Sequence, residues 1–357
     1  MKKSLIAVAA LAAVGAASAQ SSVTLYGLID TGFGVTQTKN TDAAGVVTKT
    51  RTTGLYSGGL SGSRWGLKGQ EDLGNGLSAV FNVEAGFNSA NGEFDSAADP
   101  QTGNVASVSG FNRRSVVGLK GGFGQVLLGR DYTPMDTIGG GDYFQASDLV
   151  TADDAMGNGL YTVRANGVHY AGEFGGVGVK AFVGYNDEKT TVSGVTTRRE
   201  RTEGYGVGVT YAGGPFMVGA AVQQFRSKDA VATTGKNTEY GLGASYDFTA
   251  AKLYAHYIAN DFQTPNEKPL QQFGLGVTAP FGAFTLGGQY AYNYWKVAPG
   301  VKSNGHDFVL QGTYALSKRT DVYARAARTD SWKVKTSGAT TYKTNTDNFA
   351  VGVRHRF

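Results

Sequence analysis

The sequence predicts an all-β fold, a 16-stranded antiparallel transmembrane β-barrel with a long third loop. Three observations support this prediction. The chain begins with an export leader, its composition is rich in glycine and aromatic residues, and alternating segments are separated by short turns and longer polar loops. Together these features describe an exported chain that crosses a membrane with strands instead of helices.

The N-terminus has the three parts of a secretory signal peptide. Lys2 and Lys3 precede an apolar run from Leu5 to Val14, and the small residues Ala17-Ser18-Ala19 follow it. This order matches a charged region, a hydrophobic region and a cleavage site. The run is too short and too alanine-rich for a transmembrane helix. We therefore expect a cleaved signal peptide at 1–19 and one barrel domain at 20–357.

The composition favours many short strands and argues against several other classes of protein. Glycine accounts for 53 of 357 residues, with 19 tyrosines, 19 phenylalanines and 7 prolines, whereas glycine is usually about 7% of a chain. The absence of cysteine excludes disulfides and thiolate metal sites. The lysines and arginines are scattered, which does not indicate nucleic-acid binding. The four histidines lack i,i+4 spacing, so no metal or cofactor is expected.

Seven tight turns punctuate the chain, and several of them contain the glycines that such turns favour. They lie at 73–77, 121–125, 174–178, 212–215, 248–251, 279–282 and 316–320. Eight longer polar segments alternate with them, at 38–57, 88–110, 131–163, 186–202, 226–237, 262–269, 297–305 and 332–346. Fifteen connections join sixteen strands. Short turns at one end and long loops at the other are typical of outer-membrane barrels.

The last strand shows most clearly which face is apolar. Phe349, Val351, Val353, His355 and Phe357 share one face, and the other face carries Arg354 and Arg356, because strand side chains alternate with period two. In a membrane barrel the apolar face would meet lipid and the arginines a wet lumen. A soluble all-β protein shares the alternation, but it does not explain the one-sided loop lengths.

The same parity assigns several basic residues to the lumen. Trp65, Leu67 and Gly69 suit lipid, which turns Arg64 and Lys68 inward, because a charge on the lipid face costs a few kcal/mol at the midplane. Arg114 turns inward by the same argument.

Two other arginines depend on the strand ends. Arg113 lies at a strand start, where a bend could aim it inward. Arg130 has the parity of lipid-facing Val126 and Leu128, and only a bulge or its place at the strand end would bring it into the lumen.

The third loop, 131–163, is the longest connection and is acidic. It contains Asp136 and Asp142 among six aspartates, and it contains no lysine or arginine. A long loop without secondary structure of its own is usually functional or disordered. An acidic loop opposite a basic wall would create a transverse field in a channel.

Several segments resemble the general porins of beta-proteobacteria and Neisseria, in order along the whole predicted barrel domain. The resemblance rests on Ser22–Asp30, on Ser63–Leu77 (which fits S-R-x-G-x-x-G-x-E-D-L-G-x-G-L), on Phe111–Leu119, on Gly122–Pro134, on Arg164–Tyr170 and on the closing strand. It implies a homotrimer in the bacterial outer membrane. The implied partners are outer-membrane lipid and lipopolysaccharide, the barrel-assembly machinery, and small hydrophilic solutes and ions.

The resemblance also implies roles for particular residues. The family's constriction arginines correspond to Arg64, Arg113 and Arg164, with Glu84 as an acidic partner, and the third loop folds into the barrel. Phe357 corresponds to the terminal aromatic residue that the assembly machinery reads. The expected function is therefore a general diffusion porin with mild anion selectivity and no catalysis.

Two alternatives remain open at this point. An outer-membrane barrel enzyme would need a nucleophile beside a histidine, and neither G-x-S-x-G nor such a pair is evident. A substrate-specific channel would typically carry aromatic stripes along its lumen, whereas the predicted lumen faces are charged and glycine-rich.

Overall fold

A computed structural model describes residues 22–95, 110–139, 163–192, 195–229, 235–263, 268–336 and 339–357. The expected signal peptide at 1–19 lies outside these residues. Among the residues described, no helix has the length and apolar character needed to cross a membrane.

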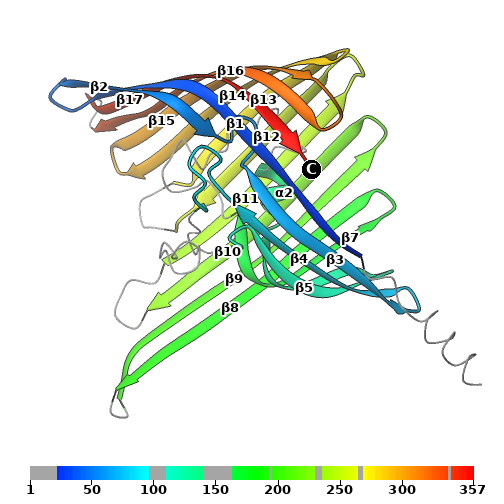
Figure 1. Ribbon diagram of the computed structural model, residues 1–357. Helices are drawn as coiled ribbons and strands as arrows, with labels where there is room; N and C mark the ends of the chain where they lie inside the picture. Colours follow the sequence, from blue (N-terminus) through cyan, green and yellow to red (C-terminus); the bar gives the residue numbers. More distant parts are fainter. Residues whose placement is uncertain are drawn as a thin grey trace, which may run out of the picture.

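The described residues form one closed antiparallel sheet, in which neighbouring strands follow one another along the chain (Figure 1). The strands are β1 (Ser22–Thr41), β2 (Val47–Ser57), β3 (Arg64–Gly74), β4 (Leu77–Gly86), β5 (Arg114–Gly121), β6 (Gly124–Tyr132), β7 (Arg164–Phe174), β8 (Val177–Val192), β9 (Val195–Gly213), β10 (Phe216–Asp229), β11 (Gly235–Asp247), β12 (Lys252–Asp261), β13 (Leu270–Phe281), β14 (Phe284–Ala298), β15 (Val301–Ala315), β16 (Thr320–Thr336) and β17 (Ala339–Arg356). The first and last strands, blue and red in Figure 1, pair along 28–41 and close the barrel.

Strands β2 and β3 are two segments of one barrel strand. β3 pairs with residues 22–28 of β1, and β2 pairs with residues 31–41 of the same strand. A bend at 58–63 separates them, held by the buried Asp30 carboxylate, which accepts bonds from the Leu60 and Ser61 amides at 2.7 and 2.8 Å. The seventeen strands of the described chain therefore make the predicted sixteen-stranded barrel.

The seven predicted turns all connect consecutive strands. In the turn between β3 and β4, Asn75 and Gly76 have φ values of 53° and 75°. A two-residue hairpin turn with both central residues at positive φ matches the right-handed twist of the strands. The backbone preferences of Asn75 and Gly76 therefore account for this turn.

Several connections at the opposite end are shorter than expected. Strand pairing extends through much of 38–57, 186–202, 297–305 and 332–346, so the predicted long loops at these positions are wrong. Both faces of β2 are largely exposed. These threonine-rich or charged segments lack a hydrophobic face. Hydrophobic alternation therefore does not identify them as strands.

The predicted alternation on the last strand is present. Phe349, Val351 and Val353 are about half exposed on the outer face. Arg354 and Arg356 turn to the other side, where both contact the Asp321 carboxylate, at 3.2 and 2.9 Å. The barrel wall thus presents apolar residues outward and charged residues inward.

A short helix, α2 (Asp136–Gly139), begins the third loop and packs against the far wall. Met135 and Ile138 have no exposed surface and form a cluster with Ala221, Ile258 and Leu270 of β10, β12 and β13. The Met135 amide also donates to Gln223 Oε1 at 3.2 Å. Because exposed Val222 alternates with buried Ala221 and Gln223, residues 133–139 contact the inner face of the wall.

Candidate functional site

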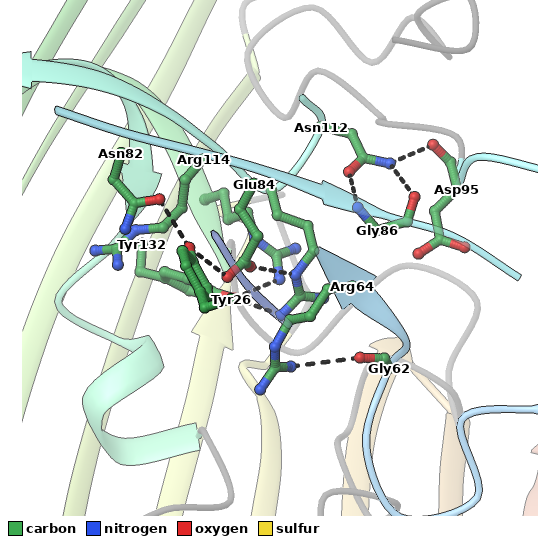
Figure 2. Close-up of polar contacts among 12 residues, drawn as sticks. Tyr26, Gly62, Arg64, Asn82, Glu84, Gly86, Asp95, Asn112, Arg114 and Tyr132 are labelled. Atoms are coloured by element: carbon green, nitrogen blue, oxygen red, sulfur yellow. Dashed lines mark hydrogen bonds and ion pairs between the residues drawn. The ribbon is translucent and has the colours of Figure 1, made fainter. Parts of the chain in front are cut away.

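Glu84 lies at the centre of the polar cluster in Figure 2 and forms an ion pair with Arg113. Arg113 precedes β5, and its Nε donates to Glu84 Oε1 at 2.6 Å. Its backbone amide donates to the Glu84 carbonyl at 3.1 Å, which fixes the bend before the strand. The Tyr26 hydroxyl donates to the other carboxylate oxygen at 3.0 Å. The bend before β5 therefore fixes the direction of the Arg113 side chain, which the sequence alone does not determine.

Tyr132, the last residue of β6, contacts three arginines. Its hydroxyl accepts bonds from Arg113 Nη2 at 2.5 Å and from Arg164 Nη2 at 3.1 Å. The guanidinium carbons of Arg164 and Arg114 lie 4.5 and 5.4 Å from its ring centre. An aromatic face attracts cations within about 6 Å. One side chain thus groups arginines that would otherwise repel each other.

Arg114 makes the second strong ion pair of the site. Its Nε and Nη2 donate to the two oxygens of Asp131 at 2.7 and 3.0 Å. A two-point contact of this kind fixes both the position and the plane of the guanidinium group. Arg114 therefore lies on the inner face, as its parity predicts.

Arg64 and two further carboxylates complete the group. The Arg64 guanidinium interacts electrostatically with Glu84, and its Nη1 lies 3.5 Å from the Gly62 carbonyl. Asp95 interacts with Arg113 and Arg164, and Asp136 of α2 interacts with Arg113. We use the name arginine cluster for Arg64, Arg113, Arg114 and Arg164 with Tyr132.

The charges of this group balance in number but not in exposure. Four arginines are accompanied by four carboxylates (Glu84, Asp95, Asp131 and Asp136). The Arg113 side chain is 14% exposed against 7% for Glu84, and Arg114 is 29% exposed against 7% for Asp131. The guanidinium groups of Arg113 and Arg114 are therefore more exposed than the carboxylates with which they pair.

Asp95 lies outside the strands and has a perturbed titration. Burial raises the pKa of its carboxyl, although Arg113 and Arg164 act in the opposite direction. The Asn112 amide donates to the Asp95 carbonyl, and its oxygen accepts the Gly86 amide at 2.7 Å. These bonds hold the segment that carries Asp95 against the end of β4.

The remaining predicted residues lie apart from the cluster or outside the described chain. The Lys68 ammonium lies 5.2 Å from the Tyr26 ring centre, two inward positions further along β3 than Arg64. Arg130 pairs in register with exposed Ser115 and Asn166, and its Nε donates to the Asn112 carbonyl at 2.7 Å. Arg130 thus keeps the outward parity of its strand. Asp142 lies outside the described residues.

Phe357 closes the seam of the barrel. Its backbone amide donates to the Gly27 carbonyl at 3.0 Å, and its carbonyl accepts the Gly27 amide at 3.1 Å. The ring lies so close to Gly27 that a Cβ there would come within 2.7 Å of it. Gly27 is therefore the residue that admits the terminal aromatic ring.

Sequence reasoning missed four members of the site: Tyr26, Asp95, Asn112 and Tyr132. Tyr26 has the inward parity of its strand, so alternation could have placed it in the lumen. The other three lie at strand ends or in loops, where parity gives no direction.

Comparisons with known proteins agree on one family. The model of the family described as Gram-negative porin matches residues 7–333. Outer membrane porin protein 32 of Delftia acidovorans is 36% identical, over 92% of this chain and 89% of the relative. A major outer membrane protein P.IB from Neisseria lactamica is 31% identical over the full length of both chains.

A solved structure extends this similarity to three dimensions. The anion-selective porin from Comamonas acidovorans has a TM-score of 0.67 and is 28% identical, covering 95% of this chain and all of that one. OmpT of Vibrio cholerae, at 19% identity and a TM-score of 0.63, shares the fold.

Proposed function

Because the chain belongs to the Gram-negative porin family and is an outer-membrane diffusion porin, we propose that the arginine cluster forms the constriction that sets its selectivity. Water-filled β-barrels pass small hydrophilic solutes without catalysis, and their preference follows from pore width and the charges that line the narrowest part. The channel is mildly selective for anions. The family and the fold favour this passive role over that of a barrel enzyme.

The observation that carries this proposal is the unequal exposure of the paired charges. Arg113 and Arg114 are at least twice as exposed as the carboxylates that neutralise them. A passing ion interacts most strongly with the charges at the surface of the channel, because it approaches those charges most closely and the Coulomb energy falls with distance. The solved relative named as an anion-selective porin supports the same sign.

The third loop, 131–163, narrows the channel from the opposite side. The support for this is the contact of Met135 and Ile138 with the inner face of β10–β13. Asp136 at the start of α2 interacts electrostatically with Arg113, so the loop brings a negative charge to the arginine cluster. Opposed charges of this kind orient dipolar solutes as they pass.

We also propose how the protein is exported and assembled. The protein is a homotrimer, exported through the signal peptide at 1–19 and folded by the barrel-assembly machinery, which reads Phe357. Family membership supports these statements. Outer-membrane lipid surrounds the apolar outer face.

Conductance and flux of the purified protein test this function. In planar bilayers, we expect stepwise openings grouped in threes. In proteoliposomes, neutral sugars should enter at rates that fall with size and rise linearly with concentration. Saturation of the rate would indicate a substrate-specific channel. A correctly folded barrel that carries no current would contradict the proposal and return the closed or enzymatic barrel to consideration.

A further inference from the structure

The third loop begins against a part of the lumen wall that carries almost no side chains. Three small residues are neighbours in register across β9, β10 and β11: Gly208, Ala221 and Gly241. Exposed Val209 and Leu242 point outward, so these three positions face the lumen, because side chains alternate along a strand. We call Gly208, Ala221 and Gly241 the loop seat.

The first residues of the third loop fill the space above the loop seat. A Cβ atom on Gly241 would lie 3.0 Å from both Ile138 Cγ2 and Met135 Cε. A Cβ atom on Gly208 would lie 3.2 Å from Pro134 Cβ. Met135 and Ile138 have no exposed surface, so the loop packs against the wall as tightly as a protein core does. Any side chain larger than hydrogen at Gly208 or Gly241 would therefore push the loop away from the wall.

Hydrogen bonds beside the loop seat fix the loop along the wall. Gln223 lies one inward position along β10 from Ala221, and its Oε1 accepts the Met135 amide at 3.2 Å. Gln223 Nε2 donates to Glu239 Oε2 at 2.5 Å, and Glu239 Oε1 accepts a bond from Asn237 at 3.0 Å. Gln223 and Glu239 are each 1% exposed, so water does not compete for these bonds. The glycines thus set the distance of the loop from the wall, and the hydrogen bonds set its position along it.

We propose that Gly208 and Gly241 determine the size of the solutes that this channel admits, because they decide how far the third loop stands out from the wall. This inference rests on the proposed narrowing of the channel by the third loop and names residues that set its extent. Passage through a water-filled pore depends on its narrowest cross-section. A loop displaced from the loop seat would occupy more of the lumen, so the largest solutes would be excluded first.

Single-channel conductance and sugar entry into proteoliposomes test the proposal with a graded series of variants. Gly241→Ala and Gly241→Val should both lower the conductance, with the larger loss for valine, because added methyl groups move the loop further into the lumen. The entry rate of a trisaccharide should fall more than that of a monosaccharide. Gly54→Val is the matched control, because Gly54 precedes outward-facing Leu55 on β2 and nothing lies within 4 Å of its Cβ position. It should leave both measurements at the wild-type level.

An engineered disulfide tests the contact itself without adding bulk to the lumen. The chain contains no cysteine, and a Cβ atom on Gly241 would lie 3.3 Å from Ile138 Cβ, close to the spacing of about 3.5–4.5 Å in a disulfide. Ile138→Cys/Gly241→Cys should therefore cross-link on oxidation and resist thiol labelling, and the cross-linked channel should keep the wild-type conductance. Ile138→Cys/Gly54→Cys should remain reduced.

Two results would overturn the proposal. One is an unchanged ratio of trisaccharide to monosaccharide entry in folded Gly241→Ala and Gly241→Val barrels, because a loss of stability alone does not alter that ratio. The other is a failure of the Ile138→Cys/Gly241→Cys pair to cross-link. A wild type without current would instead contradict the proposed function, and the cross-link, which requires no current, would still test whether the loop occupies the loop seat.

Discussion

Tyr132 holds Arg164 by two contacts at once. The guanidinium carbon lies 4.5 Å from the tyrosine ring centre, and Arg164 Nη2 donates to the hydroxyl at 3.1 Å. The same hydroxyl accepts a bond from Arg113 at 2.5 Å. One neutral side chain at the end of β6 therefore fixes the spacing of two arginines that lie 51 positions apart in the sequence.

Removing the ring of Tyr132 should disperse the cluster, whereas removing only the hydroxyl should not. Tyr132→Ala should destabilise the barrel by about 3–5 kcal/mol and raise conductance. Tyr132→Phe, which keeps the cation–π contacts, should cost about 0.5–1.5 kcal/mol. Urea unfolding and single-channel recording of both variants measure these effects. Equal behaviour of the two variants would show that the ring does not organise the arginines.

Neutralising Glu84 should increase anion selectivity. Glu84 is buried and pairs with Arg113 at 2.6 Å, so Glu84→Gln leaves a guanidinium without its counter-charge. The reversal potential in a KCl gradient should shift further toward the anion limit, and thermal stability should fall. Glu71→Gln removes the same charge from an exposed position on β3 and serves as the control. Identical shifts in both variants would place Glu84 away from the path of the ions.

Anion selectivity should rise as the pH falls, because the pKa of Asp95 is raised by burial. Its carboxyl takes up a proton at a higher pH than an ordinary aspartate, whose pKa is about 3.9. The lost negative charge lies beside Arg113 and Arg164, so the lumen becomes more positive. Reversal potentials between pH 4 and 7 measure this effect. Asp95→Asn should remove the part of the change in selectivity that begins at the higher pH values. The control is Asp72→Asn at the exposed β3–β4 turn.

The same titration has a consequence for stability. A raised pKa means that the folded state favours the protonated carboxyl, so this contribution is present at low pH and is lost as pH rises through the folded-state pKa. Asp95→Asn should therefore be more stable than the wild type at pH 7. A less stable variant at pH 7 would contradict this sign.

Asp30 and Tyr323 should stabilise the closing seam. The carboxylate has no exposed surface and accepts the Tyr323 hydroxyl at 2.7 Å in addition to the two amides of the 58–63 bend. Tyr323→Phe leaves this buried acceptor short of one donor, which costs about 1–3 kcal/mol. Tyr246→Phe, on the outer face, should cost less. Thermal unfolding of the two variants, read from gel mobility, compares them, and equal losses would refute the role of the Asp30 contact.

Alternation predicted the wall of the barrel better than it predicted the site. The outward Phe349 and Val351 and the inward Arg354 follow from period two alone, because every residue of a paired strand obeys it. Arg113 and Tyr132 lie where strands begin or end, and their directions depend on contacts with distant residues. Glu84 lies 29 positions from Arg113, so no local pattern reveals that pair.

The extended hairpins escaped prediction for a related reason. Lys39, Lys49 and Arg51 lie in the parts of β1 and β2 whose two faces are both polar, and hydrophobic periodicity gives no signal there. Their pairing became visible only in the register of β1 and β2.

The reversal potential of an Arg64→Gln/Arg113→Gln/Arg164→Gln variant, beside the wild type in a tenfold KCl gradient, tests the central claim most directly. Lys318→Gln/Arg319→Gln provides a variant with charges removed outside the cluster. We expect the wild type on the anion side, the control unchanged, and the triple variant shifted toward cations with its conductance retained. A triple variant that conducts with the wild-type reversal potential would place the selectivity of this channel elsewhere than in the arginine cluster.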